Sequence, residues 1–208
     1  MAIWSEDFPD DHRIEDDPAA LNRFIDDRRD RLDSRAVFLG TNPSSELPPP
    51  FANFHWCNNS TSRRNIARLK HAVQDGSLQT LQSAYMTDAS TVAEADVGNV
   101  RLSPSDIDDL CDRLSIFDEP VHHVICCGGD PFKTAVRRFK GTRTRTEAVT
   151  DLPANVEPIT GRMGGKRFDF YKIWHYSNWT KNYLEELPEQ LALVDNRVAN
   201  TSEQGEHD

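Results

Sequence analysis

The sequence contains no apolar run that approaches the ~20 residues needed to cross a membrane. It has only four cysteines, and none of them has the Cys-x-x-C spacing typical of zinc and redox sites. Adjacent Cys126 and Cys127 stand inside an apolar segment, where buried thiols are expected rather than metal ligands. We therefore expect neither a metal nor a cofactor, and a cytoplasmic protein that works away from membranes.

Acidic residues are unevenly spread, although the whole chain carries 34 of them against 24 basic residues. Residues 1–34 contain 11 acidic and 5 basic side chains, and residues 183–208 contain 7 and 1. Two stretches between them, residues 47–74 and 131–146, have no acidic residue. Such basic segments suit a phosphate-binding face, although solvated helix faces and an exposed loop give the same pattern. The second stretch supplies the candidate DNA contacts Arg137, Arg138, Lys140, Arg143 and Arg145.

Short apolar segments alternate with amphipathic ones along the chain. Strands are predicted over residues 35–40, 83–90, 121–129 and 167–174. Helices are predicted over residues 18–32, 62–74 and 103–117, and a fourth is expected to be capped by Asp130 with Pro131 at its first position. This alternation implies parallel strands. We predict an α/β fold, a three-layer α/β/α sandwich around a central, mostly parallel four-stranded sheet.

The charge distribution and the periodicity also divide the chain. Residues 1–34 are expected to form an acidic N-terminal segment with one helix, residues 35–193 the α/β/α domain, and residues 194–208 a disordered acidic tail. Gly164 and Gly165 mark a turn before the last strand. One domain is thus expected to carry the function.

Glycines and polar residues follow the predicted strands. In parallel sheets, ligands bind outside the carboxyl ends of the strands. The segments expected to meet there are Gly40-Thr41-Asn42-Pro43, Thr87-Asp88, Gly128-Gly129 and His175-Tyr176-Ser177. This edge is the candidate functional site.

The order of the segments GTNPSS, YMTDAS, ICCGGDPFKTAV and WHYS resembles the uracil-DNA glycosylase superfamily, over about residues 35–183. In that superfamily a G-x-[NDE]-P motif, a base-reading motif, a strand–glycine–helix segment and an H-x-S motif follow in this order, and the resemblance is closest to the G-x-N-P branch. It implies a DNA glycosylase that acts on DNA as a monomer, flips a base out of the stack and hydrolyses its N-glycosidic bond. No lysine stands at a motif position to form a Schiff base, so a monofunctional enzyme is expected.

The resemblance assigns catalytic roles to two residues. Asn42 would position the attacking water, which an amide cannot deprotonate, and a slow enzyme is expected. His175 would donate a hydrogen bond to O2 of the departing base, either neutral or protonated. A simple Asn-Pro turn and a strand-end histidine bonded to backbone are the alternatives for these two residues.

The resemblance also assigns residues that hold the base. Gly40, Thr41 and Pro43 complete the first substrate-binding motif. Phe54 is the expected stacking ring, with Phe51 and Trp56 as rivals. A core aromatic under a loop is the alternative for this ring.

The segment after the last strand would contact the DNA itself. Ser177 would bind a phosphate beside the flipped nucleotide. Asn178 and Trp179 stand where the superfamily carries an aliphatic wedge, so here a polar or bulky wedge would fill the gap left by the base.

Asp88 departs from the superfamily pattern, which commonly has asparagine there. A carboxylate would accept from the exocyclic amine of cytosine, and a protonated carboxyl would also donate to N3. We therefore expect a cytosine-like or modified base, as in the modified DNA of phages, or a lesion, rather than plain uracil; the phage case would make the enzyme antiviral. The alternative is that Asp88 or Ser90 caps a following helix.

Two other function classes fit the same residues. The domain is alternatively a non-catalytic DNA-binding or regulatory module that uses the basic loop of residues 137–145, or a hydrolase of free nucleotides or phospho-sugars. A glycosylase leaves an alkali-labile abasic site and loses this activity, but not DNA binding, with Asn42→Ala. A hydrolase of free nucleotides does not need the basic loop.

Overall fold

The computed structural model describes residues 33–43, 68–73, 78–94, 96–141, 158–176 and 181–204. Residues 68–73 are helical, in agreement with the helix predicted around them. The other elements are β1 (Asp33–Gly40), η3 (Leu81–Ser83), β2 (Ala84–Asp88), η4 (Val97–Asn99), α3 (Pro104–Leu114), β3 (Val121–Cys127), α4 (Gly129–Lys140), β4 (Ile159–Met163), β5 (Lys166–Ile173) and α6 (Lys181–Gln204). The helix predicted over residues 18–32 lies outside the described residues.

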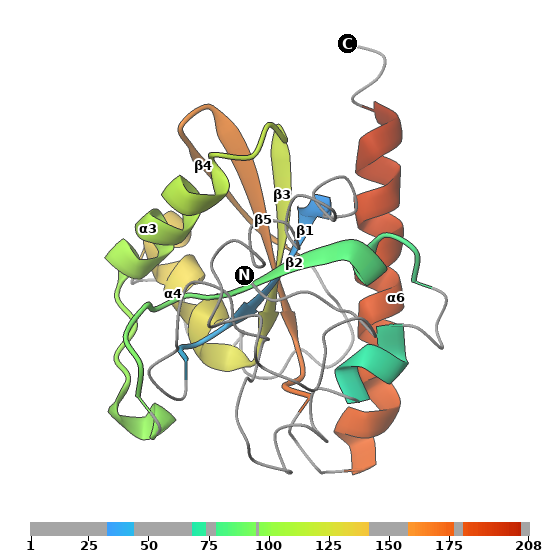
Figure 1. Ribbon diagram of the computed structural model, residues 1–208, viewed down its shortest axis with the longest axis horizontal. Helices are drawn as coiled ribbons and strands as arrows, with labels where there is room; N and C mark the ends of the chain where they lie inside the picture. The colour runs from blue at the N-terminus through green and yellow to red at the C-terminus, as the bar shows by residue number, and fades with distance from the viewer. Residues whose placement is uncertain are drawn as a thin grey trace, which may run out of the picture.

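The strands form one five-stranded sheet in the order β2-β1-β3-β5-β4. Strands β2, β1, β3 and β5 are parallel to their neighbours, and β4 pairs with β5 in the antiparallel sense. Helices α3 and α4 cover one face of the sheet and α6 covers the other (Figure 1). The predicted α/β class and three-layer, mostly parallel arrangement are confirmed, but the sheet has five strands instead of the four predicted.

Strand β4 is the strand that the sequence pattern did not reveal. It forms a hairpin with β5 through Gly164 and Gly165, whose φ angles of 58° and 81° are typical of a tight two-residue turn, as the glycine pair predicted. Its central residue, Gly161, has no side chain and weakens the strand signal. The ring of Phe139 packs there from α4, and a β-carbon on Gly161 would lie 2.6 Å from it. A side chain from another element therefore covers this strand.

Apolar side chains on successive strand residues enter two separate cores. Phe38 and Ile125 belong to the core under α6, whereas Leu39 and Val124 belong to the core under α3 and α4. This alternation follows from the two-residue period of a strand. It also decides which strand-end residues share a face of the sheet.

The starts of α3 and α4 differ in how well the sequence predicted them. Ser103 precedes α3, and the carboxylate of Asp106 accepts a hydrogen bond from its backbone N–H at 2.7 Å, as in a capping box. The predicted cap of α4 is wrong, because Gly128 occupies the cap position and Asp130 lies in the first turn. A carboxylate in the first turn still interacts favourably with the helix dipole.

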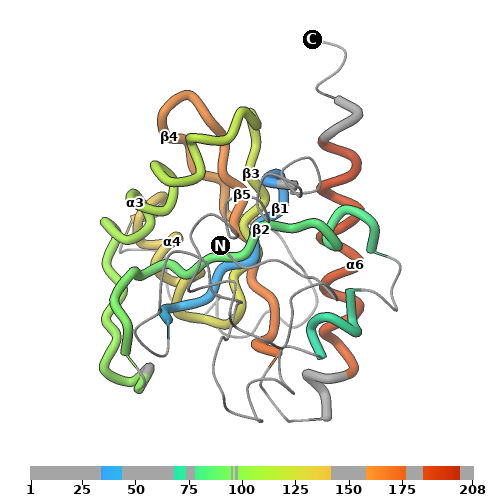
Figure 2. The backbone as a smooth tube through the Cα atoms, in the orientation of Figure 1, coloured from blue at the N-terminus to red at the C-terminus, as the bar shows by residue number. Residues whose placement is uncertain are grey.

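The prediction of a disordered tail from residue 194 is wrong for residues 194–204, which continue α6. Figure 2 follows this helix as a continuous tube alongside the sheet. Pro188 lies inside the helix and obscures its pattern, because proline normally breaks a helix interior. The buried residues that hold the helix on the sheet are Leu187, Leu191, Val194 and Val198. Their helical spacing forms an apolar stripe, and its burial holds the helix in place.

A polar contact adds to this packing. The carboxylate of Asp195 accepts hydrogen bonds at 3.0 Å from two backbone N–H groups at the start of η3. Bonds to a charged acceptor are stronger than neutral ones. Among the described residues, no helix is long and apolar enough to cross a membrane.

Candidate functional site at the carboxyl edge of the sheet

The ends of the parallel strands meet at one edge of the sheet. Gly40, the last residue of β1, pairs with Asp88, the last residue of β2. The chain continues this pairing beyond the strands, since the N–H of Ala89 donates to the Gly40 carbonyl at 3.0 Å. On the other side, the N–H of Gly128 donates to the Ile173 carbonyl at 3.2 Å. The segments predicted to meet therefore do so, as far as they are described.

The side chain of Asn42 is held by backbone carbonyl groups. Its Nδ2 donates to the carbonyl oxygens of Pro43 and Glu94, both at 2.8 Å. The group that faces two carbonyls must be the NH₂, so the orientation of the amide is determined and Oδ1 points elsewhere as an acceptor. The N–H of Glu94 donates in turn to the Pro43 carbonyl at 3.0 Å. Asn42 is therefore more than a turn residue, because it fastens the loop after β2 to the loop after β1.

Asp88 has a carboxyl group without a hydrogen-bond or ion-pair partner among the described residues. Loss of hydration raises the pKa of this carboxyl to about 6, although the nearby Arg113 guanidinium opposes the shift. The helix-cap alternative fails for this residue, since the first helical turn after β2 begins only at Val97. Ser90 does not cap a helix either, and its Oγ accepts from the Val92 N–H at 3.1 Å. Among the described residues, the Asp88 carboxyl is thus a partly buried group that caps no helix.

Arg113 was not among the residues that the sequence singled out. It lies in the last turn of α3, and its Nη2 donates to the Asp88 carbonyl at 2.9 Å. Its Nε is buried and has no hydrogen-bond partner in the described part of the chain. Arg113 therefore holds the backbone at the end of β2, and within the described residues it makes no hydrogen bond to the Asp88 carboxylate. Only the packing of α3 on the sheet reveals this contact.

His175 is packed between its neighbours at the end of β5. A β-carbon on Gly128 would lie 3.4 Å from its Cδ2, and its ring stacks on that of Tyr176 with 4.6 Å between centroids. Burial lowers the pKa of His175 below its ordinary value of 6.5. The imidazole is therefore neutral at neutral pH, and a neutral imidazole has one N–H to donate.

Helix α6 fastens the end of β5 beside this histidine. The backbone N–H of Trp174 donates to Oε1 of Gln190 at 2.8 Å, and its indole Nε1 donates to Oε2 of Glu186 at 2.6 Å. The Nζ of Lys172 lies 5.3 Å from the centre of the indole ring. These contacts fix the strand end one residue before His175.

The predicted DNA-binding residues of α4 lie away from this edge. Phe139, near the end of α4, packs on Gly161 of β4. Gly161 and His122, near the start of β3, both pair with the same residue of β5, so they lie at the same height in the sheet. Cys127 stands five residues further along β3, roughly 17 Å away at the rise of a strand. The last turn of α4 contains Arg137, Arg138 and Lys140. The structure does not bring these three residues to the strand ends.

Two of these basic side chains contact α3 or the residues just before it. Arg138 pairs with Asp108 at 2.6 Å. Arg137 donates to the Leu102 carbonyl at 3.2 Å and to Oγ1 of Thr134 at 2.8 Å. Basic residues at the end of a helix also interact favourably with its dipole. Their presence in the sequence therefore has a structural explanation.

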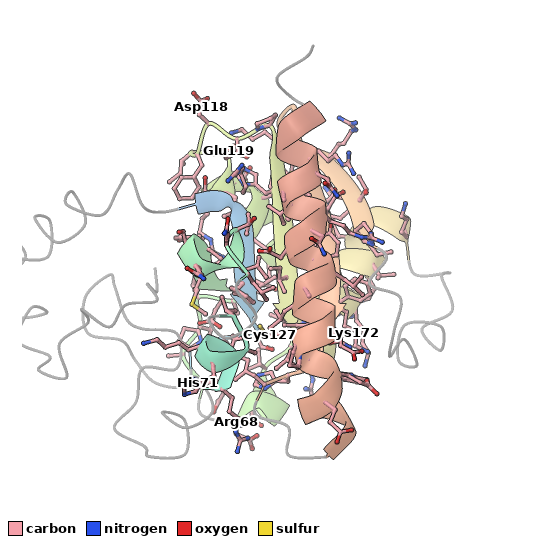
Figure 3. All side chains as sticks on the ribbon, turned by 90° about the vertical axis from the view of Figure 1, so that its right-hand side faces the viewer. Arg68, His71, Asp118, Glu119, Cys127 and Lys172 are labelled. Atoms are coloured by element: carbon pink, nitrogen blue, oxygen red, sulfur yellow. The ribbon has the colours of Figure 1, made fainter. Side chains whose placement is uncertain are left out.

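A different basic residue lies at the same end of the molecule as the site. Figure 3 shows Arg68 and His71 toward the end of β3 where Cys127 lies, with Asp118 and Glu119 at the opposite end. Arg68 belongs to the other stretch without acidic residues, which was the signal that could have identified it.

The remaining predicted site residues lie outside the described residues. They are Phe54 with its rivals Phe51 and Trp56, and Ser177, Asn178, Trp179, Arg143 and Arg145. Their roles stay predictions.

A second group of titratable side chains lies toward the other end of the sheet. Buried Asp169 accepts hydrogen bonds from Oγ1 of Thr160 at 2.6 Å and from Nε of Arg167 at 3.0 Å. Nδ1 of His123 bonds to the Tyr171 hydroxyl at 3.0 Å, and burial lowers the pKa of this histidine to about 4. These groups satisfy one another, as buried structural networks do. Among the described residues, no group of histidine, cysteine and acidic side chains is placed to hold a metal ion.

Comparison of the chain with models of known protein families and with curated proteins finds no match. The resemblance to the uracil-DNA glycosylase superfamily therefore rests on the motif residues themselves. The predicted catalytic and substrate-binding residues among them that the structure describes are Gly40, Thr41, Asn42, Pro43, Asp88 and His175.

Proposed function

We propose that this chain is a monofunctional DNA glycosylase that removes a cytosine-like, modified or damaged base rather than plain uracil. The observation that carries the proposal is the arrangement at one sheet edge of an oriented amide, an unpaired carboxyl and a neutral imidazole, supplied by Asn42, Asp88 and His175. In an α/β sheet this edge is where ligands bind.

Asn42 provides the acceptor for the attacking water. Both hydrogen bonds to the carbonyls are donated by its Nδ2, so Oδ1 is the acceptor that the amide would offer to water. An amide oxygen orients water but takes no proton from it, so the chemistry depends on stabilising the cationic sugar and the departing base. The proposal therefore includes a slow enzyme.

His175 stabilises the departing base. Its lowered pKa makes it a neutral donor at neutral pH. A neutral N–H aimed at O2 stabilises the negative charge that develops on the base as the glycosidic bond breaks. The ring lies beside Gly128, where an added β-carbon would be 3.4 Å from its Cδ2.

Asp88 selects the base. Ionised, its carboxylate accepts from an exocyclic amine; protonated, it also donates to a ring nitrogen. A pKa of about 6 makes both states accessible near neutral pH. Cytosine presents this pair of groups, whereas uracil presents the reverse pair.

The DNA contacts complete the proposal. The enzyme is proposed to act as a monomer in the cytoplasm, with Phe54 stacking on the flipped base and Ser177 binding a phosphate. Asn178 and Trp179 would then fill the space that the base leaves in the stack. Arg68, at the same end of the molecule as Cys127, is better situated for a phosphate than the basic residues of α4.

The proposal is tested by a base-release screen. Purified full-length protein is incubated with genomic DNA containing ordinary bases, with DNA from phages that carry modified bases, and with oligonucleotides that each contain one lesion. Released bases are identified by mass spectrometry, and abasic sites are detected by alkaline cleavage. Asn42→Ala should abolish release and retain DNA binding, whereas Asn99→Ala on exposed η4 should leave release unchanged.

The outcomes separate the proposal from its rivals. Salt-dependent DNA binding without release of any base would identify a DNA-binding or regulatory module instead. Hydrolysis of free nucleotides without release from DNA would identify the hydrolase. Release that persists in Asn42→Ala would overturn the role given to the amide.

A further inference from the structure

Three strand ends form a lateral row of side chains. Asp88 on β2 pairs with Gly40 on β1. Leu39 of β1 pairs with Cys126 of β3. One residue further along each strand, Gly40 is therefore level with Cys127. Because neighbouring strands lie about 4.8 Å apart, the Cα atoms of Asp88 and Cys127 are roughly 10 Å apart with Gly40 between them.

All three residues of this row belong to the face of the sheet that α6 covers. Cys127 is part of the core under α6, and so is Met86, two residues before Asp88. Side chains two residues apart on a strand share a face. Gly40 has no side chain, so β1 places no side-chain atoms between the Asp88 carboxyl and the Cys127 thiol. Figure 3 shows Cys127 beside α6, at the end of the sheet away from Asp118 and Glu119.

The two groups also interact electrostatically. Burial, and to a smaller extent the charge of Asp88, raises the pKa of the Cys127 thiol far above its ordinary value. Cys127 is therefore a neutral thiol that acts as a small apolar surface and not as a nucleophile. A neutral, weakly polar neighbour also leaves the Asp88 carboxyl without a competing partner for its hydrogen bonds.

We propose that Cys127 is a specificity-determining residue of this site, and that with Gly40 it forms the small, apolar floor beside Asp88 on which the excised base rests. The inference rests on the proposed function and narrows its substrate class. The base must present hydrogen-bonding groups to Asp88. To Cys127 it must present a ring carbon that carries only hydrogen or a methyl group. A base with a charged or bulky substituent on that edge is excluded.

The neighbouring cysteine supplies a matched control. Cys126 is also fully buried in β3, but it belongs to the core under α3 and α4. Equivalent substitutions at the two positions make similar changes in a packed core, on opposite faces of the sheet. Only those at Cys127 alter the surface next to Asp88.

The test compares Cys127→Val and Cys127→Ala with Cys126→Val and Cys126→Ala. Initial rates of base release are measured on oligonucleotides that contain cytosine, 5-methylcytosine, uracil or thymine at one position. The quantity of interest is the ratio of rates for the methylated and unmethylated member of each pair. Because both rates come from one protein preparation, partial unfolding of a variant cancels from the ratio.

One methyl group in an apolar site is worth about 10- to 200-fold in discrimination. Cys127→Val should therefore lower the ratio of methylated to unmethylated base release about 10-fold or more, and Cys127→Ala should raise it. The Cys126 variants should leave the ratio as in the unchanged protein.

The failure of this inference is distinguishable from that of the proposed function. If the unchanged protein releases a base and the Cys127 variants keep its ratios, the inference is wrong and the glycosylase proposal stands. Equal shifts in the Cys126 variants would overturn the inference as well, because the effect would then be one of general packing. If the unchanged protein releases none of these bases and none in the wider screen, the proposed function fails, and the inference fails with it.

Discussion

The ring of His175 lies directly against Gly128, so that a β-carbon on this glycine would stand 3.4 Å from Cδ2 of the imidazole. Gly128 has a φ of 105°, a backbone conformation that residues with a side chain rarely adopt, and it immediately precedes α4. One glycine therefore lets the chain turn from β3 into α4 and also lets β5 place its histidine beside that turn.

Gly128→Ala should reduce base release by displacing His175. The new methyl group would lie 3.4 Å from Cδ2 of the imidazole, at the short end of van der Waals contact, and the positive φ adds backbone strain of about 1 kcal/mol. Gly165→Ala is the control, because its φ of 81° imposes a similar strain with nothing within 4 Å of the new methyl group. Thermal unfolding should show losses in both variants, and a release assay should show a loss only in Gly128→Ala. Equal activity in the two folded variants would contradict the positioning role.

Asn42→Asp should destabilise the protein. The carboxylate would face the carbonyl oxygens of Pro43 and Glu94, which now accept hydrogen bonds at 2.8 Å. Loss of such bonds and the repulsion that replaces them should cost about 1–3 kcal/mol in urea unfolding. Asn99→Asp on exposed η4 should cost much less. A variant as stable as the unchanged protein would show that the Asn42 amide is not held as described.

Asp88 should make the protein less stable as the pH rises from about 4 through 6. Burial raises its pKa from the ordinary 3.8 to about 6, so the folded state binds the proton more tightly than the unfolded chain does. This contribution to stability is present at low pH and is lost as the carboxyl ionises in the folded state. The advantage of Asp88→Asn over the unchanged protein should therefore grow across this window in urea unfolding. Parallel pH profiles of the two proteins would contradict the raised pKa.

The contact between Trp174 and Glu186 should couple the end of β5 to α6. The indole N–H donates to the carboxylate at 2.6 Å, and a partly buried hydrogen bond of this kind is worth about 1 kcal/mol. A double-mutant cycle with Trp174→Phe and Glu186→Ala, followed by urea unfolding, should give a coupling energy of this size. A cycle with exposed Glu189→Ala in place of the Glu186 change should give none. A coupling energy near zero in both cycles would contradict the proposal that this contact helps α6 to hold the strand end beside His175.

Local patterns were sufficient for much of the fold and for the expectation that the strand ends meet at one edge. Short apolar runs predicted β1, β2, β3 and β5, and their order predicted a mostly parallel sheet. Asn42, Asp88 and His175 were expected at its carboxyl edge, and their proposed roles stay predictions. The stretch that forms α6 was misread from residue 194 on, because Pro188 interrupts a pattern that the buried stripe completes. Strand β4 was missed because its centre is a glycine that Phe139 covers.

The sequence by itself determined the α/β class and the glycine and polar residues that end each strand, since these depend on periodicity and turn chemistry within a few residues. Tertiary structure alone decided that Arg138 contacts α3 and Arg137 the residues just before it, away from the strand ends. It also decided that Arg113 binds the backbone of Asp88 and, among the described residues, not its carboxyl. It also decided that Cys127 stands level with Gly40 beside Asp88, because register between strands is set by long-range pairing and by which face is buried.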